Sequence, residues 1–244
     1  GSAPHGVFTG PDGKAWLTDG GLNAIVGYDP AMKKFTVYRL PEETGYTNLN
    51  TAAVDRNGDV WFTGQTGVYG KVDVKSGKVT AWAAPKGRGP YGITATKKGD
   101  VYYASLAGSY VGRIDIATGK VTVLEPPTKN QGARRVWADS KDRIWVSEWN
   151  SGNVSVYDPA NGSWKQWRLP GSNPKTYAVY VDDEGKVWLA DWGANTLVRF
   201  DPVTEKFESF PLPAETANVR QIDGRKGEIL LPLSGPRLVA VFKK

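Results

Sequence analysis

One pattern of short apolar segments recurs along this 244-residue chain, and it limits the possible folds more than any other feature. In its clearest copy, residues 187–190 and 196–200 are apolar, and a polar, glycine-containing connection separates them. Both segments are rich in β-branched and aromatic residues, which favour strands, and Asp201-Pro202 behind them favours a turn. Two such strands cannot bury their apolar faces alone, so the copies must pack against one another.

The spacing of the copies identifies the kind of repeat. Each copy has a large residue in its second strand, at Trp16, Trp61, Tyr102, Trp145, Trp188 and, more weakly, Leu230, at intervals of 45, 41, 43, 43 and 42 residues. A period of about 40–45 residues built from short strands is typical of a β-propeller with one blade per repeat. Some helical repeats have a similar period, but the alternating apolar pattern and the frequent Gly, Pro, Asn and Asp residues argue against helices.

We therefore predict an all-β fold: a single β-propeller domain over residues 1–244 with six blades of four antiparallel strands. The repeats span approximately 3–44, 45–87, 88–129, 130–171, 172–214 and 215–244. The last repeat reaches only a third strand. Two explanations stay open: the last blade is three-stranded, or the chain has been trimmed from a seven-bladed parent.

Composition narrows the classes of function. The chain has no cysteine, which excludes disulfides and thiolate metal sites, and it has no apolar run long enough to cross a membrane. Its formal net charge is +6, but the lysines and arginines are spread over every repeat. Scattered charge favours solubility over nucleic-acid binding. We expect a monomer that binds a small molecule and neither a membrane nor nucleic acid.

A candidate site follows from positions at which the repeats differ. Eleven residues before each aligned position lies a residue expected at the mouth of the central channel: His5, Asn50, Tyr91, Arg134, Tyr177 and Val219. Arg135 and Arg220 follow two of these residues, and the loops expected on the same face contain Glu148, Trp149, Asp191 and Trp192. Different residue types at equivalent places on a repeated scaffold are typical of one asymmetric pocket.

The arginines suggest what such a pocket would bind. Neighbouring residues on a strand point to opposite sides, so at most one of Arg134 and Arg135 is expected to face the channel. A buried arginine needs a carboxylate partner, for which Glu148 is a candidate, or an anionic ligand. We predict that Asn50, Tyr91, Arg134, Arg135, Trp149, Tyr177, Trp192 and Arg220 bind a small anionic or amphipathic molecule. The alternative is structural: the two tryptophans cover blade edges, and Glu148 and Asp191 cap turns or pair with neighbouring arginines.

Several phrases of the sequence resemble one known family. Pro90-Tyr91-Gly92-Ile93, Gly185-Lys186-Val187-Trp188, Asp191-Trp192-Gly193-Ala194-Asn195 and the run from Asp115 to Thr122 are similar to motifs of the virginiamycin B lyase (streptogramin lyase) family. The resemblance implies a bacterial propeller, typically seven-bladed. It favours a secreted or periplasmic location and leaves a cytoplasmic one open.

The resemblance also implies a chemistry. Lyases of this family open a cyclic depsipeptide at its ester by elimination, with histidines and a Mg²⁺ ion held partly by a glutamate. A base removes the acidic proton while a cation stabilises the enolate. In this chain only His5 occupies such a histidine position, and Lys175 stands where the family has the glutamate, although Glu148 and Asp191 are oxygen ligands suited to Mg²⁺.

Three functions therefore stay open. We favour a ligand-binding propeller without the full lyase machinery. The first alternative is a Mg²⁺-assisted carbon–oxygen lyase with His5 as the catalytic residue and Glu148 or Asp191 at the metal. The second is a scaffold that binds protein or RNA on one face.

Overall fold

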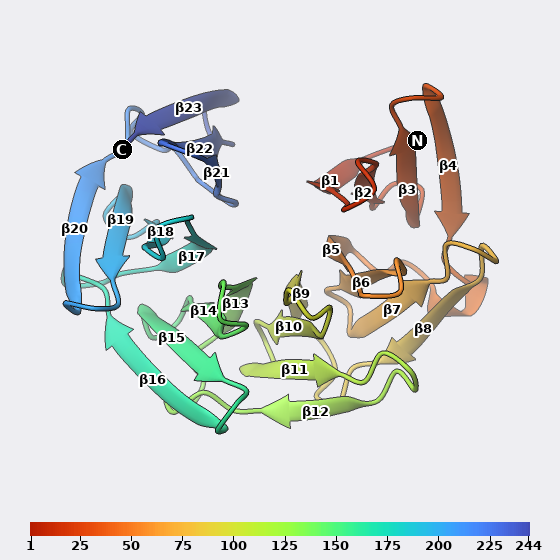
Figure 1. Cartoon of the computed structure of the whole chain (residues 1–244), viewed down its shortest axis with the longest axis horizontal. Coiled ribbons are helices and arrows are strands. Elements are labelled where there is room, and N and C mark those ends of the chain that lie inside the picture. The colour runs from red at the N-terminus through yellow and green to blue at the C-terminus, as the bar shows by residue number, and fades with distance from the viewer. The chain divides into compact units, whose positions relative to one another are not determined.

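The computed structural model describes residues 1–244, which form two compact units, Gly1–Glu125 and Pro126–Lys244. Each unit contains three antiparallel sheets, and each sheet is built from strands that follow one another in the chain (Figure 1). Strands therefore pair with their sequence neighbours, as tight turns between alternating apolar segments require.

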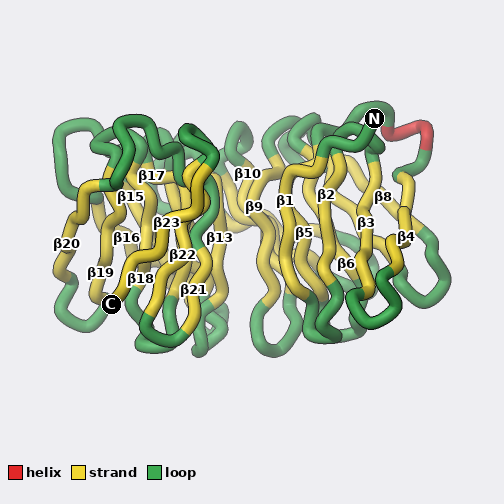
Figure 2. Tube along the Cα trace, turned by 90° about the horizontal axis from the view of Figure 1, so that it is seen from above, coloured by secondary structure: helices red, strands yellow, loops and turns green.

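The first unit contains three four-stranded sheets and the single helical turn of the chain, η1 (Glu42–Thr44), drawn in red in Figure 2. Its strands are β1 (Pro4–Thr9), β2 (Ala15–Asp19), β3 (Ala24–Asp29), β4 (Lys34–Arg39), β5 (Leu49–Val54), β6 (Val60–Gly64), β7 (Val68–Val72), β8 (Val79–Ala83), β9 (Pro90–Ala95), β10 (Val101–Ser105), β11 (Tyr110–Ile114) and β12 (Val121–Leu124).

The second unit contains two four-stranded sheets and one three-stranded sheet. Its strands are β13 (Ala133–Ala138), β14 (Ile144–Glu148), β15 (Asn153–Asp158), β16 (Ser163–Arg168), β17 (Thr176–Val181), β18 (Val187–Asp191), β19 (Thr196–Asp201), β20 (Lys206–Pro211), β21 (Asp223–Arg225), β22 (Glu228–Leu233) and β23 (Leu238–Lys243).

The predicted class, an all-β, six-bladed β-propeller whose last blade has three strands, is confirmed. Every sheet lies within one of the predicted repeats. That the whole chain acts as one domain stays a prediction, because its contacts divide into two units of three blades each. The structure has no helix with the length and apolar character needed to cross a lipid bilayer.

Neighbouring sheets within each unit pack through two different faces. Trp61 and its neighbours on one face of β5–β8 pack against Val101 and Ile114 of the next sheet. In the second unit, Trp145 packs in the same way against Leu189 and Val198 of β17–β20. We call these the indole face and the aliphatic face of a blade. Each hydrophobic core thus combines the indole face of one sheet with the aliphatic face of the sheet after it.

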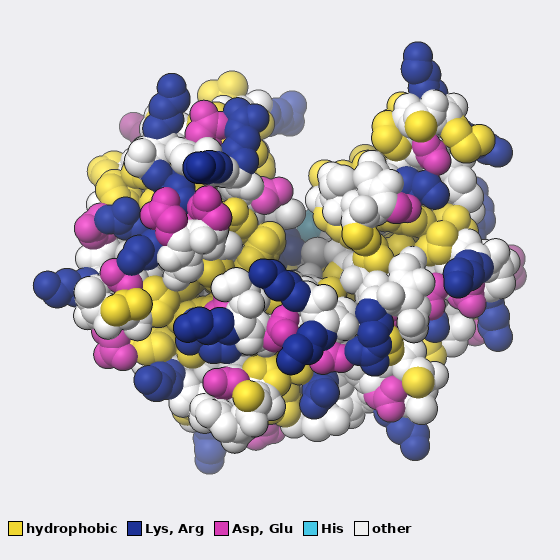
Figure 3. Space-filling model, viewed as in Figure 1, with side chains coloured by type: hydrophobic (Ala, Val, Ile, Leu, Met, Phe, Trp, Pro, Cys, Tyr) yellow, Lys and Arg dark blue, Asp and Glu magenta, His cyan; other side chains and the backbone are white.

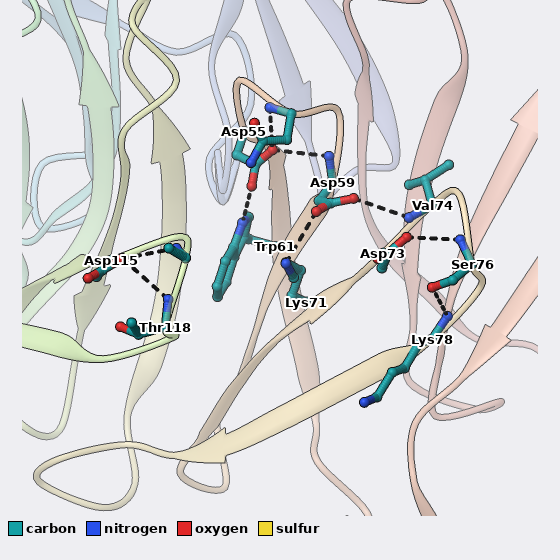
Figure 4. A network of polar contacts seen from close by, with 12 residues as sticks. Asp55, Asp59, Trp61, Lys71, Asp73, Val74, Ser76, Lys78, Asp115 and Thr118 are labelled. Carbon is teal, nitrogen blue, oxygen red and sulfur yellow. Dashed lines mark hydrogen bonds and ion pairs between the residues drawn. The ribbon is translucent and has the colours of Figure 1, made fainter.

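Buried aspartates fasten the hairpin between the first two strands of three blades. Asp55 accepts a hydrogen bond of 2.7 Å from Trp61 Nε1, as Figure 4 shows, and its other oxygen accepts the backbone N–H of Asn57 at 2.8 Å. Asp139 and Asp182 hold the indoles six residues after them at 2.9 Å. One carboxylate therefore satisfies both the turn and a buried indole, which fixes the hairpin to the core.

Charged side chains do not gather into one stripe on the face seen in Figure 3. Lysine and arginine side chains are scattered there and alternate with aspartate and glutamate. This distribution agrees with a role of the net charge of +6 in solubility.

Candidate functional site

The first strand of five sheets has an irregular register at the positions that the repeat spacing singles out. In β1, Pro4 pairs with Asp19 and Gly6 pairs with Thr18, so His5 is one residue more than β2 can match. The bulges of the other four sheets contain Arg134, Asn50-Thr51, Tyr91-Gly92 and Tyr177-Ala178. A β-bulge bends the strand and redirects its side chains, and bulges are common beside binding sites. Each of these blades thus has one redirected position, and the residue there varies from His5 and Asn50 to Arg134, with tyrosine in two blades.

The bulge changes the expectation for the two neighbouring arginines. Strict alternation would send Arg134 and Arg135 to opposite sides of β13. Instead their guanidinium carbons lie 3.6 and 5.9 Å from the centre of the same Tyr177 ring. Because the extra residue interrupts the alternation, the rule does not separate these two side chains.

A hydroxyl group fastens several bulges to the neighbouring blade. Ser147 Oγ accepts the backbone N–H of Arg135 at 3.0 Å and donates to the carbonyl of Tyr177 at 2.5 Å in the next sheet. Thr18 makes the same two bonds in the first unit, and Thr63 donates to the carbonyl of Tyr91. These hydroxyls satisfy backbone groups that the bulge leaves out of the strand ladder.

Arg134 lies against aromatic rings from two blades of the second unit. Its guanidinium carbon is 3.6 Å from the Tyr177 ring centre and 4.4 Å from that of Trp149. Tyr177 stacks on Trp192 with ring centres 4.7 Å apart and an interplanar angle of 21°. Trp149 stands nearly perpendicular to both rings. The rings therefore fix the guanidinium by cation–π and packing contacts.

Two more cations complete this group. The Arg220 guanidinium lies 5.5 Å above the Trp192 ring, and Lys175 Nζ lies 6.0 Å from the Trp149 ring. Trp192 is itself held by a 2.8 Å hydrogen bond from its indole N–H to the carbonyl of Val219. We call Arg134, Trp149, Lys175, Tyr177, Trp192 and Arg220 the arginine–aromatic cluster.

Exposure separates the roles of the rings. Tyr177 is fully buried, whereas Trp149 and Trp192 are half-buried and Arg220 is exposed. Tyr177 therefore supports the guanidinium of Arg134 from beneath. The surface that a ligand can touch comes from the two indoles and the cations.

The carboxylates predicted for a metal are engaged within their own blades. Glu148 is fully buried, and its two oxygens accept hydrogen bonds from the hydroxyls of Ser151 (2.6 Å) and Ser155. Burial raises its pKa despite these hydrogen bonds. Asp191 Oδ1 accepts the backbone N–H groups of Lys175 and Gly193 at 2.7 and 2.8 Å.

This donor set does not fit a magnesium ion. Mg²⁺ requires accessible oxygens in octahedral geometry and keeps several of its waters. A sealed carboxyl whose oxygens already accept two hydroxyls cannot offer this, and no three His, Asp or Glu side chains are grouped for a metal.

The remaining predicted residues belong to the first unit. His5 is exposed, and its Nδ1 lies 3.0 Å from the carbonyl of Asn50. Asn50 is fully buried, and its Oδ1 accepts the Thr51 hydroxyl at 2.7 Å. Tyr91 is also buried. The structure thus brings together His5 with Asn50 in one unit, and the arginines, Trp149, Tyr177 and Trp192 in the other.

The sequence analysis missed two kinds of residue. Lys175 entered only as a departure from the family pattern, yet it lies over Trp149. The hydroxyls of Thr18, Thr63 and Ser147 were overlooked, although each stands two residues after an aligned tryptophan. This repeated spacing indicates a shared structural role for the three hydroxyls.

Comparison with known structures gives close matches to β-propellers. A catalytically inactive variant of virginiamycin B lyase from Staphylococcus aureus with quinupristin matches with a TM-score of 0.84, 21% identity, and coverage of 99% of this chain and 84% of that chain. A streptogramin B lyase matches with a TM-score of 0.85, 22% identity, and coverage of 99% and 83%. Hydrazine synthase from Kuenenia stuttgartiensis matches with a TM-score of 0.84, 15% identity, and coverage of 98% and 76%.

At these identities the matches show the fold alone. A search of curated proteins finds no match. The model of the virginiamycin B lyase family matches residues 1–161, about two thirds of the sequence. The chain belongs to the virginiamycin B lyase family.

Proposed function

We propose that this protein binds a small anionic or amphipathic molecule at the arginine–aromatic cluster. The observation that carries the proposal is the gathering of three cations on aromatic rings, with Arg134 and Lys175 beside Trp149 and Arg220 beside Trp192. Neither Lys175 nor Arg220 forms an ion pair. Cations held close together beside apolar rings repel one another, and an anion relieves that cost.

Arg134 is suited to recognise a carboxylate. The rings of Tyr177 and Trp149 contact its guanidinium and limit its motion. A stacked guanidinium keeps N–H groups in its plane, and that edge matches the two oxygens of a carboxylate. Because the rings already hold the side chain, less conformational entropy is lost when the ligand binds.

The half-buried indoles supply the apolar part of the interaction. Trp192 cannot turn freely, because its indole N–H is bonded to the carbonyl of Val219. Trp149 packs at 79° against it. Two rigid rings at this angle give an amphipathic or aromatic ligand a large contact area.

The family relationship supports an amphipathic ligand in general terms. The inactive Staphylococcus aureus virginiamycin B lyase was crystallised with quinupristin. In this chain the carboxyls proposed for a metal are engaged, so we derive no metal-assisted elimination. Incubation with a cyclic depsipeptide, with and without a chelator, tests the lyase alternative, because elimination linearises the ring and changes its chromatographic retention.

Calorimetry with indole-3-acetate and its neutral amide tests the binding proposal. The carboxylate should bind more tightly than the amide, and Arg134→Ala should weaken it at least about tenfold, or about 1.4 kcal/mol. Arg134→Lys should recover only part of the loss, because lysine keeps the charge without the fork.

Arg199→Ala is the matched control. Arg199 also lies over a tryptophan of the second unit, Trp188, at 5.8 Å, but it is paired with Glu208 away from the cluster. Its removal should leave binding unchanged. Equal heats for the carboxylate with wild type and Arg134→Ala would refute the proposal.

A further inference from the structure

The indole face of the first blade lacks a side chain that the other blades have. In the second and fifth blades, Lys71 and Arg199 stand opposite the aligned tryptophan, and their cationic groups lie 5.6 and 5.8 Å from the centre of its indole ring. The third, fourth and last blades have arginine or valine at this position. In the first blade the residue opposite Trp16 is Gly27, so no side chain from that position covers the indole.

A cavity of about 190 Å³ lies at this place, where the first blade packs on the second within the first unit. Trp16 and Gly27 line it, together with side chains of β2–β4 and their turns, and Val74 lines it from the second blade. A Cβ atom at residue 27 would lie 2.9 Å from the Trp16 ring, so any larger residue there would have to displace the indole. The volume is below the roughly 300–1,000 Å³ of pockets for drug-sized molecules, so a ligand of this cavity must be small.

The charges that line the cavity favour an anion. Two lysines, Lys14 and Lys34, line it together with one carboxylate, Asp29. Asp29 Oδ1 accepts the backbone N–H groups of Ala31 and Met32 at 3.0 and 3.1 Å, and its Oδ2 lies 3.9 Å from Lys14 Nζ. Lys34 pairs with Asp29 along the strand ladder but forms no ion pair with it or with any other carboxylate. The cavity therefore has one positive charge in excess, which a single anionic group would neutralise.

The rest of the lining is apolar. Trp16 is buried, and the half-buried ring of Tyr38 stands beside it with ring centres 6.0 Å apart. Val74 is also half-buried, and Met32 at the edge is 69% exposed. A few charged groups beside aromatic and aliphatic walls are typical of sites for small organic ligands, because the walls contact the ligand's body while the charges fix its orientation.

We propose that this cavity is a second binding site, and that it takes a small carboxylate with an apolar body. The carboxylate pairs with Lys34 and Lys14, and the apolar body lies against Tyr38 and Val74, in the space that the missing side chain at Gly27 leaves open. The site is separate from the arginine–aromatic cluster, which belongs to the other unit, and it does not depend on the function proposed for that cluster.

Nuclear magnetic resonance of the indole N–H groups tests the proposal, with benzoate as the ligand and its neutral amide, benzamide, for comparison. The signal of Trp16 is a local reporter, and it is assigned by its loss in the spectrum of Trp16→Phe. Millimolar benzoate should shift this signal in a saturable way, and benzamide should bind about fivefold more weakly. Lys34→Gln should weaken benzoate binding by a similar factor, because it removes the unpaired charge.

Lys33→Asn is the matched control. Lys33 is the exposed neighbour of Lys34 and does not line the cavity, and asparagine tolerates its positive φ of 52°. This variant loses the same charge and should bind benzoate as wild type does. Arg134→Ala should also leave the shift of the Trp16 signal unchanged, which separates this site from the cluster. A Trp16 signal that does not shift in a saturable way with benzoate, or equal weakening by Lys33→Asn and Lys34→Gln, would overturn the proposal.

Discussion

The two ends of a blade use the same repeated scaffold in opposite ways. At the hairpin end, three blades repeat one device, in which Asp55, Asp139 or Asp182 bonds a turn and an indole. At the bulged end, the equivalent residues vary among the blades: two are tyrosines, and the others are His5, Asn50 and Arg134. The difference indicates that the hairpin end maintains the fold, whereas the bulged end is free to vary, which supports the ligand binding that we propose there.

The largest loss of stability should come from removing an indole at the hairpin end. Trp145 is fully buried, so Trp145→Ala should lower the free energy of unfolding by about 3–5 kcal/mol. Trp149→Ala, only four residues away but half-buried at the bulged end, should cost about 1 kcal/mol or less and should abolish most ligand binding. Urea denaturation measures both. Equal losses of stability in the two variants would contradict the separate roles of the two ends.

Asp139→Asn should lower the free energy of unfolding by a smaller amount, and this amount should depend on pH. Burial opposes the charge, but hydrogen bonds from Trp145, Lys141 and Arg143 lower the pKa of Asp139 below 3.8. The wild-type carboxylate therefore stabilises the fold above the unfolded pKa, and this contribution is lost as the pH falls through the lower, folded pKa. The variant should be about 2 kcal/mol less stable at neutral pH, and the gap should narrow in acid. A gap that does not change with pH would contradict this account.

Ser147→Ala should affect both the stability of the fold and the affinity for the ligand. It removes the hydroxyl that joins the bulge at Arg135 to the carbonyl of Tyr177, so the free energy of unfolding should fall by about 1 kcal/mol. Because Tyr177 supports Arg134, affinity for indole-3-acetate should fall as well, whereas Ser147→Thr should retain both. A variant with reduced stability and full affinity would show that the hydroxyl is only structural.

Glu148→Gln should have the smallest effect on stability. The direction in which this effect changes with pH tests whether the pKa of Glu148 is raised. Burial raises the pKa of Glu148, so between the ordinary value of 4.5 and the higher folded value the folded state binds more protons than the unfolded state. Wild-type stability therefore falls as the pH rises through this window, and glutamine avoids that loss. In thermal melts, the stability of the variant relative to that of wild type should increase from acid to neutral pH. A constant difference would show that Glu148 does not titrate in this range.

Much of this architecture could be predicted because the repeat is strong. The strands predicted at 187–190 and 196–200 end within one residue of β18 and β19, since alternation and turn residues define them locally. The class of the fold and the positions of the variable residues followed from the same period. These features depend on sequence neighbours.

The rest depends on three-dimensional contacts that a single period does not encode. The bulge at Arg134 comes from a register between two strands, so strict alternation failed there. The sequence suggests Glu148 as an oxygen ligand, but its oxygens accept hydrogen bonds from Ser151 and Ser155 inside the blade. The stacking of Arg134 on Tyr177 requires two blades to meet, which the sequence of either blade does not reveal.

We propose that the bulged end selects a ligand and that the hairpin end maintains the fold. The most direct test measures indole-3-acetate affinity and the free energy of unfolding on two variants side by side, Arg134→Ala and Asp139→Asn. We predict that Arg134→Ala loses affinity at least about tenfold with stability nearly unchanged, and that Asp139→Asn loses stability with affinity unchanged. The reverse pattern, or a joint loss of both properties in both variants, would contradict it.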